Sequence, residues 1–225
     1  MKNCRFLFLI SFILWLSCND NKQSPSITSI KNIDTSSPQI NLQTEQDGKT
    51  DRTIWQKPYI IIELLGDLSN QVIADIGAGS GYFSFRFVHK AKKVIAVDIE
   101  KELVDMMIAE KSYYKQEIQN KFEARLAQAD NPNLEDNEID IAFIANTYPY
   151  ISNRIQYLKK LRSKFKANGK IMIVDFKKKL TPIGPSQEER LAQSEVEQEL
   201  IDAGYQLIIS DDTTLQYQYI IVAKI

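Results

Sequence analysis

The stretch DIGAGSG at residues 75–81 decides the fold of this chain. It follows a short apolar run, Val72–Ile76, and precedes an apolar stretch starting at Tyr82 that is typical of a helix. Glycines in such a turn tolerate positive φ and let a ligand approach the backbone closely. At the end of the next apolar run stands Asp98, from which a carboxylate can accept hydrogen bonds from two ribose hydroxyls. A glycine loop followed by an acid at this spacing predicts a nucleoside site.

The spacing of the glycines excludes a dinucleotide fingerprint. The pattern G-x-G-x-x-G counted from Gly77 requires a third glycine at position 82, where the chain has Tyr82. An acid at Asp75 would repel a pyrophosphate at the helix N-terminus but suits a ligand with a cationic end. The pattern D-x-G-x-G-x-G instead resembles motif I of class I S-adenosylmethionine-dependent methyltransferases.

The resemblance extends from about residue 51 to residue 225 and implies S-adenosyl-L-methionine as the cofactor. It implies that Asp98 binds the ribose, that Asp130 reaches the adenine amino group, and that Asn146 lies near the methyl-bearing side. The residues that it implies for cofactor binding are Asp75, Gly77, Ala78, Gly79, Gly81, Asp98, Ile99, Asp130, Asn131 and Asn146. Methyl transfer requires alignment and desolvation more than a covalent catalyst, so no catalytic residue is assigned.

Apolar runs place the elements around the glycine loop. Helices are expected at 58–65, 82–89, 100–111, 154–165 and 187–203, and strands at 72–76, 93–99, 122–127, 139–145, 170–176, 205–210 and 216–223. The first five strands alternate with helices and are continuously apolar, which predicts a parallel sheet covered on both faces. The link at 211–215 is too short for a parallel crossover. The expected fold class is a three-layer, Rossmann-like α/β domain with a mostly parallel seven-stranded sheet and an antiparallel C-terminal hairpin.

Candidate contacts for the methyl acceptor lie at two places in the sequence. Tyr148 and Tyr150 follow Asn146, and Trp55 belongs to a segment, 51–58, where many members of the family have a helix that closes over the cofactor. A core position at the edge of the sheet is an equal alternative for Trp55. The segment NTYPY at 146–150 is only superficially similar to the [DN]-P-P-[YFW] box of amino-methylating enzymes, because its second and third residues are not proline. The acceptor is expected to be a small molecule.

Composition and charge exclude several other functions. The chain has 28 Lys and Arg against 29 Asp and Glu, so its net charge of -1 provides no field for non-specific nucleic-acid binding. Two Cys and one His cannot form a structural zinc cluster, and no metal site is expected. His89 is interpreted as a residue near a helix C-terminus, and Lys177–Lys179 as a solvated strand exit.

The N-terminus resembles a bacterial lipoprotein signal. Lys2 and Arg5 precede an apolar run at 6–16 that is too short to span a bilayer comfortably, and WLSC at 15–18 resembles a lipobox with Trp15 where Leu is usual. Residues 1–17 are therefore expected to be a signal peptide, with Cys18 lipidated. An ordinary signal peptide or an uncleaved anchor remains open.

A polar segment follows the lipobox. Residues 18–50 lack a hydrophobic period and are expected to form a disordered tether, followed by one domain at 51–225. These features predict a lipoprotein anchored in the bacterial cell envelope, or a domain that faces the cytoplasm from an uncleaved anchor. Because S-adenosylmethionine is made in the cytosol, an envelope-anchored ligand-binding module without catalysis is the alternative function.

Overall fold

A computed structural model describes residues 51–225, so the expected signal segment 1–17, the tether 18–50 and Cys18 lie outside the described residues. Within residues 51–225, no helix has the length and apolar character needed to cross a membrane.

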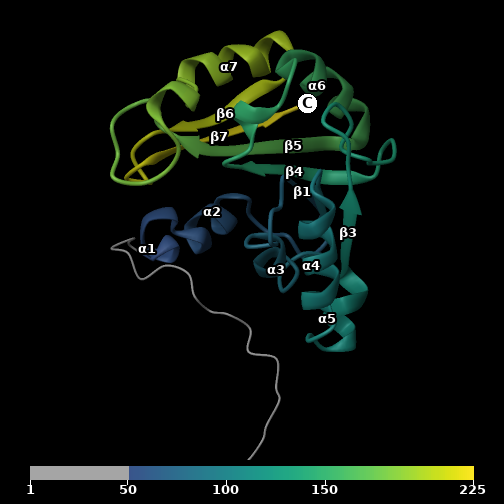
Figure 1. The fold of residues 1–225 in the computed structure, drawn as a ribbon. Coiled ribbons are helices and arrows are strands. Elements are labelled where there is room, and N and C mark those ends of the chain that lie inside the picture. Colours follow the sequence, from purple (N-terminus) through teal and green to yellow (C-terminus); the bar gives the residue numbers. More distant parts are fainter. Residues whose placement is uncertain (1–50) are drawn as a thin grey trace, which may run out of the picture. The chain divides into compact units, whose positions relative to one another are not determined.

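The domain is built on one seven-stranded sheet (Figure 1) with the order β3-β2-β1-β4-β5-β7-β6. Parallel pairs join β1 to β2 and β4, β2 to β3, and β4 to β5, whereas β7 is antiparallel to both β5 and β6. The fold class expected from the sequence, including the reversed C-terminal strand, is confirmed. The strands are β1 (Val72–Ile76), β2 (Lys93–Asp98), β3 (Phe122–Leu126), β4 (Ile139–Ala145), β5 (Phe165–Phe176), β6 (Gln206–Asp211) and β7 (Gln218–Lys224).

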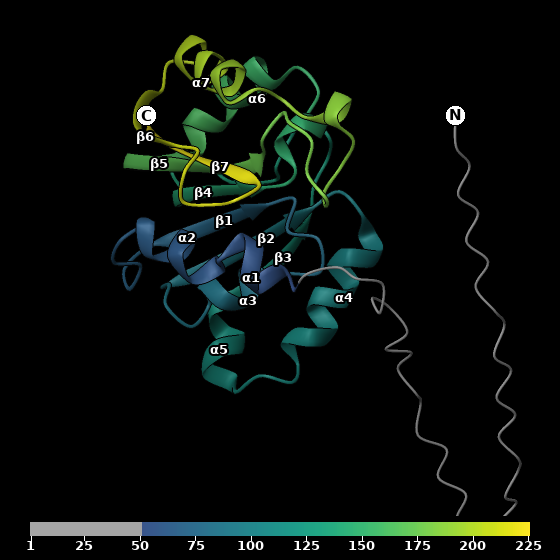
Figure 2. The same cartoon turned by 90° about the vertical axis from the view of Figure 1, so that its left-hand side faces the viewer.

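Helices cover both faces of the sheet and bury two apolar clusters (Figures 1 and 2). One cluster lies between the sheet and α6 and α7, and the other lies between the sheet and α2, α3 and α4. All five residues of β1 are buried, as a continuously apolar central strand requires. The helices are α1 (Arg52–Gln56), α2 (Pro58–Leu64), α3 (Ser84–Phe87), α4 (Lys101–Lys111), α5 (Gln116–Lys121), α6 (Arg154–Leu161) and α7 (Gln193–Asp202).

Several elements differ from the sequence expectation. The helix after the glycine loop is only the single turn α3, although Phe83 and Phe87 are buried as expected. Strand β5 begins at Phe165 rather than at 170, because Asn168 adopts φ 65° and forms an irregularity within the strand. Helix α7 begins at Gln193 rather than at 187, because Arg190 has an extended backbone that ends a short 3-10 turn.

Helices α4 and α5 show where the amphipathic pattern was ambiguous. In α4 the buried residues are Val104 and Met107, whereas the adjacent Met106 is 56% exposed. Helix α5 was not expected from the sequence, and none of its residues is buried.

Candidate cofactor site

A cavity of about 270 Å³ opens at the carboxyl ends of β1, β2 and β4, where parallel strands of this topology bind ligands. We call it the C-terminal cavity. Its volume lies near the lower end of the range for small-molecule pockets, about 300 Å³. The lining residues are Ile76, Gly77, Val97, Asp98, Ile99, Glu100, Leu103, Ala127, Gln128, Ala129, Thr147, Tyr150, Ile151 and Tyr157.

The glycine loop contributes Gly77 to the wall of this cavity, whereas its Ala78, Gly79 and Gly81 are not among the lining residues. Its glycines Gly77, Gly79 and Gly81 have φ of 72°, 59° and 85°, a region that other residues rarely adopt. The backbone N–H groups of Gly77 and Ala78 donate to the carbonyl of Val97 at 2.8 and 3.0 Å, which fixes the loop to β2.

Gly77 and Gly79 differ in the space that a side chain would have at each position. A Cβ at Gly77 would lie 2.3 Å from the side chain of Thr147, whereas a Cβ at Gly79 would meet nothing within 4 Å. The hydroxyl of Thr147 also donates to the carbonyl of Gly77 at 3.3 Å. Gly77 is therefore required for packing, while Gly79 leaves an open backbone surface that a ligand can approach.

Asp98 lies beside the glycine loop, at the end of β2. Its carboxylate is 7% exposed and accepts hydrogen bonds from the backbone N–H of Gly79 at 2.8 Å and of Glu100 at 3.0 Å. These bonds hold the carboxylate against the cavity wall beside Ile99, where ribose hydroxyls could donate to it. The geometry fits the role that the resemblance implies for Asp98.

Asp75 lies beneath the loop rather than in the cavity wall. It is 2% exposed, and its Oδ2 accepts a hydrogen bond from the hydroxyl of Ser84 at 2.5 Å. Burial raises the pKa of Asp75 to about 6, while the Ser84 hydroxyl and the nearby charge of Arg52 act in the opposite direction. Asp75 thus supports the loop and supplies negative charge from below.

Two arginines stack on the residue that follows the loop, and we call Arg52, Tyr82 and Arg86 the arginine stack. The guanidinium carbons lie 3.9 Å and 3.8 Å from the centroid of the Tyr82 ring, so they must occupy opposite faces. Neither arginine has a carboxylate at ion-pair distance among residues 51–225, and the Tyr82 hydroxyl and Arg86 Nε are buried without a hydrogen-bond partner there. The positive charge of the two arginines and the free N–H of Arg86 Nε fit the carboxylate at the methionine end of S-adenosylmethionine.

The segment after β3 differs from the expectation. Ala127, Gln128 and Ala129 line the C-terminal cavity, whereas Asp130 and Asn131 do not. The side chain of Asp130 is 72% exposed and pairs with Lys160 at 3.3 Å. Asp130 and Asn131, which the resemblance implies for adenine, therefore lie outside the wall of this cavity, and their contact with adenine stays a prediction.

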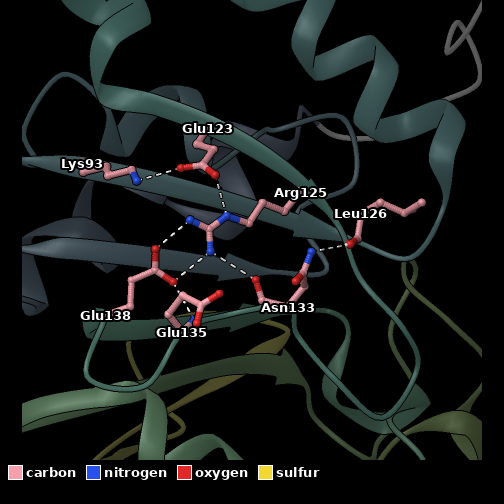
Figure 3. A network of polar contacts seen from close by, with 7 residues as sticks. All are labelled: Lys93, Glu123, Arg125, Leu126, Asn133, Glu135 and Glu138. Carbon is pink, nitrogen blue, oxygen red and sulfur yellow. Dashed lines mark hydrogen bonds and ion pairs between the residues drawn. The ribbon is translucent and has the colours of Figure 1, made fainter.

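A polar network fixes the path of this segment (Figure 3). Arg125 on β3 donates to both carboxylate oxygens of Glu138 at 2.6 and 2.8 Å, to Glu123 at 2.6 Å, and to the backbone carbonyl of Asn133 at 3.1 Å. Lys93 on β2 adds an ion pair with Glu123 at 2.7 Å. The network closes the loop at 127–138 onto the sheet and so shapes the wall at Ala127–Ala129.

At the end of β4, the structure separates the residues that the sequence had grouped. Tyr150 lines the cavity and is 59% exposed, whereas Tyr148 is fully buried and its hydroxyl donates to Glu199 on α7 at 2.7 Å. Tyr148 is therefore a core residue and not an acceptor contact. Asn146 has φ 59° and does not line the cavity, and its Oδ1 accepts from Gln218 Nε2 at 2.5 Å. Thr147, which sequence reasoning missed although it follows Asn146 directly, lines the cavity instead.

Trp55 and His89 lie away from the cavity wall. The Trp55 ring packs 5.5 Å from the ring of Phe176 at the end of β5, which fits the alternative of a packing residue at the edge of the sheet. His89 is exposed after the end of α3. Among residues 51–225, no group of His, Cys, Asp and Glu is arranged to hold a metal ion.

Comparisons with known proteins match this geometry. A family model described as "Methyltransferase domain" matches residues 67–220. The chain is 30% identical over 109 residues to the ribosomal RNA small subunit methyltransferase A of Mycoplasmopsis synoviae (strain 53), and the match covers 48% of this chain and 39% of that protein. The chain thus spans about two fifths of the length of this curated relative.

Solved structures share the fold. A SAM-dependent methyltransferase from Aquifex aeolicus superposes with a TM-score of 0.72 at 23% identity, covering 79% of this chain and 94% of that chain. An S-adenosylmethionine-dependent methyltransferase from Mesorhizobium loti superposes with a TM-score of 0.62 at 12% identity, covering 76% and 97%. At these identities the likeness concerns the fold.

Proposed function

This chain belongs to the methyltransferase-domain family and depends on S-adenosylmethionine, and we propose that its methyl acceptor is a small molecule. The observation that carries this proposal is the lining of the C-terminal cavity. Its charged residues are the two acids Asp98 and Glu100, and it contains neither Lys nor Arg. An apolar and acidic wall of this kind suits a compact ligand better than a polyanion.

Different residues of the chain bind different parts of the cofactor and so align its methyl group with the acceptor. When bound, S-adenosylmethionine supplies an electrophilic methyl group on a positively charged sulfur, which becomes a neutral thioether as the acceptor's lone pair forms the new bond. Asp98 binds the ribose hydroxyls, and Ile99 and Leu103 provide apolar contact. The arginine stack binds the carboxylate end, and Asp75 offsets its charge from beneath the loop. Holding the reactants in line lowers the barrier without a covalent catalyst.

Calorimetry of the full-length protein with S-adenosylmethionine tests the cofactor site. Replacing Asp98 by Ala should weaken binding by about 1.5–3 kcal/mol, the cost of losing charged hydrogen bonds. Asp202→Ala removes an exposed acid at the end of α7 and should leave the affinity unchanged. No binding to the wild-type protein at millimolar cofactor would contradict the proposal.

The curated relative offers a second candidate acceptor, because its name assigns it to ribosomal RNA. The acidic cavity wall and the net charge of -1 weigh against RNA for this chain. We expect no binding of a single-stranded RNA oligonucleotide at low salt. RNA binding that weakens steeply as the salt concentration is raised would contradict the small-molecule proposal and favour RNA as the methyl acceptor.

For localisation, we propose that Cys18 carries a lipid and anchors the domain in the bacterial cell envelope. The support is the charged and apolar N-terminal segment with WLSC at 15–18. Labelling with radioactive palmitate should be lost in Cys18→Ser and retained in Cys4→Ser. Label that survives in Cys18→Ser contradicts the anchor.

The alternative, a ligand-binding module without catalysis, predicts cofactor binding with no methyl transfer to any acceptor.

A further inference from the structure

Two buried side-chain amides lie beyond the C-terminal cavity, at the ends of β5 and β7. Gln56 at the end of α1 and Gln218 at the start of β7 are both 0% exposed. The elements bring them to the same part of the fold. Trp55, the neighbour of Gln56, packs 5.5 Å from Phe176, and Phe176 is the strand partner of Gln218. Strand partners in an antiparallel pair share a face, so both amides lie on the side of the sheet that α1 covers.

Each amide is held by one of its two polar atoms. Gln56 Oε1 accepts a hydrogen bond from Arg52 Nε at 2.5 Å, which leaves Gln56 Nε2 buried with no partner among residues 51–225. Gln218 Nε2 donates to Asn146 Oδ1 at 2.5 Å, and Gln218 Oε1 likewise has no partner within the described part of the chain. The bonds to Arg52 and Asn146 therefore orient one free donor and one free acceptor. Buried polar atoms without partners destabilise a fold, so two of them together call for an explanation.

We propose that Gln56 Nε2 and Gln218 Oε1 recognise the methyl acceptor, and that this acceptor carries an uncharged amide-like edge, with a hydrogen-bond acceptor beside a donor. The inference rests on the proposed function and specifies its substrate class. A carboxylate would place its oxygens against Gln218 Oε1, and an ammonium group would place its donors against the Gln56 amide. Only a neutral group with both functions satisfies both atoms.

Gln218 is connected through Asn146 to the cavity in which the cofactor binds, so an acceptor held by the two amides can reach the methyl group. Asn146, which orients Gln218, is followed directly by Thr147 in the wall of the C-terminal cavity. Helix α1 covers the amides, and its last residue is joined to α2 through Lys57 with φ 47°. Because both amides are fully buried, a ligand can reach them only if α1 moves outward about this junction and then closes again.

The test uses benzamide and benzoate, which differ only in the amide and the carboxylate. Ligand-observed NMR on the full-length protein, saturated with S-adenosylhomocysteine, should give at least tenfold tighter binding of benzamide. Gln56→Met and Gln218→Met should each weaken benzamide binding at least fivefold. Gln198→Met makes the same change on an exposed face of α7 and should have no effect.

Equal binding of the two probes by the wild-type protein overturns the inference, and so does unchanged benzamide affinity in Gln56→Met. The comparison of probes requires no variant, so it stands even if Gln218→Met does not fold. Binding of S-adenosylhomocysteine is measured in the same samples. Normal binding of it without amide preference overturns only this inference, whereas its absence contradicts the proposed function.

Discussion

Gly77 and Gly79 have similar backbone angles, but only Gly77 is packed against another side chain. Gly77→Ala should destabilise the protein by about 2–4 kcal/mol, because the new methyl group meets Thr147 and the positive φ is strained. Gly79→Ala should cost only about 1–2 kcal/mol, the strain alone, yet weaken cofactor binding because the methyl group covers the open backbone surface. Urea unfolding and calorimetry of both variants measure the difference. Equal losses of stability would contradict this assignment.

Asp175, near the end of β5, should make stability depend on pH. Burial raises its pKa to about 7, against an ordinary value of 3.8, although the backbone N–H of Phe176 donates to it. The folded state therefore holds this proton more tightly than the unfolded state. The stabilisation is complete below about pH 4 and is lost as the pH rises through 7. Relative to wild type, Asp175→Asn should gain on the order of 2–4 kcal/mol between pH 4 and pH 8.

Urea unfolding of the wild type and of Asp175→Asn at pH 5 and pH 8 measures this effect. The pKa of Glu123 is lowered to about 2, first by the hydrogen bond from Arg125, so its contribution is lost only as the pH falls below about 4.5 and does not interfere. Parallel pH profiles for the two proteins would show that Asp175 does not titrate in this range.

Among the elements, β3 and the loop that follows it depend on one side chain. Arg125→Met should destabilise the protein by about 1–3 kcal/mol, because Glu138 and Glu123 lose charged hydrogen bonds. Cofactor affinity should fall as well, since the loop carries Ala127–Ala129 into the cavity wall. Lys101→Met removes an exposed pair within α4 and should change neither quantity. Unaltered cofactor affinity in Arg125→Met would show that the loop keeps its path without the network.

Most strands could be predicted from the sequence because they are apolar runs that end at a polar turn, whereas β3 also contains Glu123 and Arg125. The helices were harder. Helix α5 has no buried residue and so gives no amphipathic signal. In α4 the apolar residues lie all around the helix, so the pattern could not choose Met107 over Met106. The start of α7 depends on Arg190, whose guanidinium donates to the carbonyls of Lys179 and Ile183 in a preceding loop. Such a long-range contact leaves no local pattern.

The candidate site, like the fold, could be predicted from the sequence only where local residues determine it. The glycine loop and Asp98 were found because a short segment of sequence determines both the turn and its residues. Tyr148 was assigned wrongly because the positive φ of Asn146 redirects the chain after β4. Asp130 lies outside the cavity wall because Arg125 and Glu138 set the path of the chain after β3, so its contact with adenine stays a prediction. The amides Gln56 and Gln218 come from opposite ends of the domain and show no motif.

At the scale of the whole molecule, ligand binding should raise stability by mass action. S-adenosylhomocysteine at 100 times its Kd should add about 2.7 kcal/mol, provided that it binds only the folded state. For a domain of this size, that corresponds to a rise of about 5–10 °C in Tm. Thermal unfolding of the full-length protein measures the shift, and Asp98→Ala at the same ligand concentration should show a much smaller one. An equal shift in both would place the ligand elsewhere.

The position of β7 has a consequence for the order of events during synthesis. β7 follows β6 in the chain, yet it lies between β5 and β6 and pairs with both (Figure 1). When β6 leaves the ribosome, its only neighbour in the sheet has not yet been made. The nascent chain can therefore assemble the part of the sheet from β3 to β5, which includes the glycine loop and Asp98. Until β7 is made, β5 has no hydrogen-bonded neighbour on its other edge. Closure of this side of the sheet therefore comes only after β7 has been made.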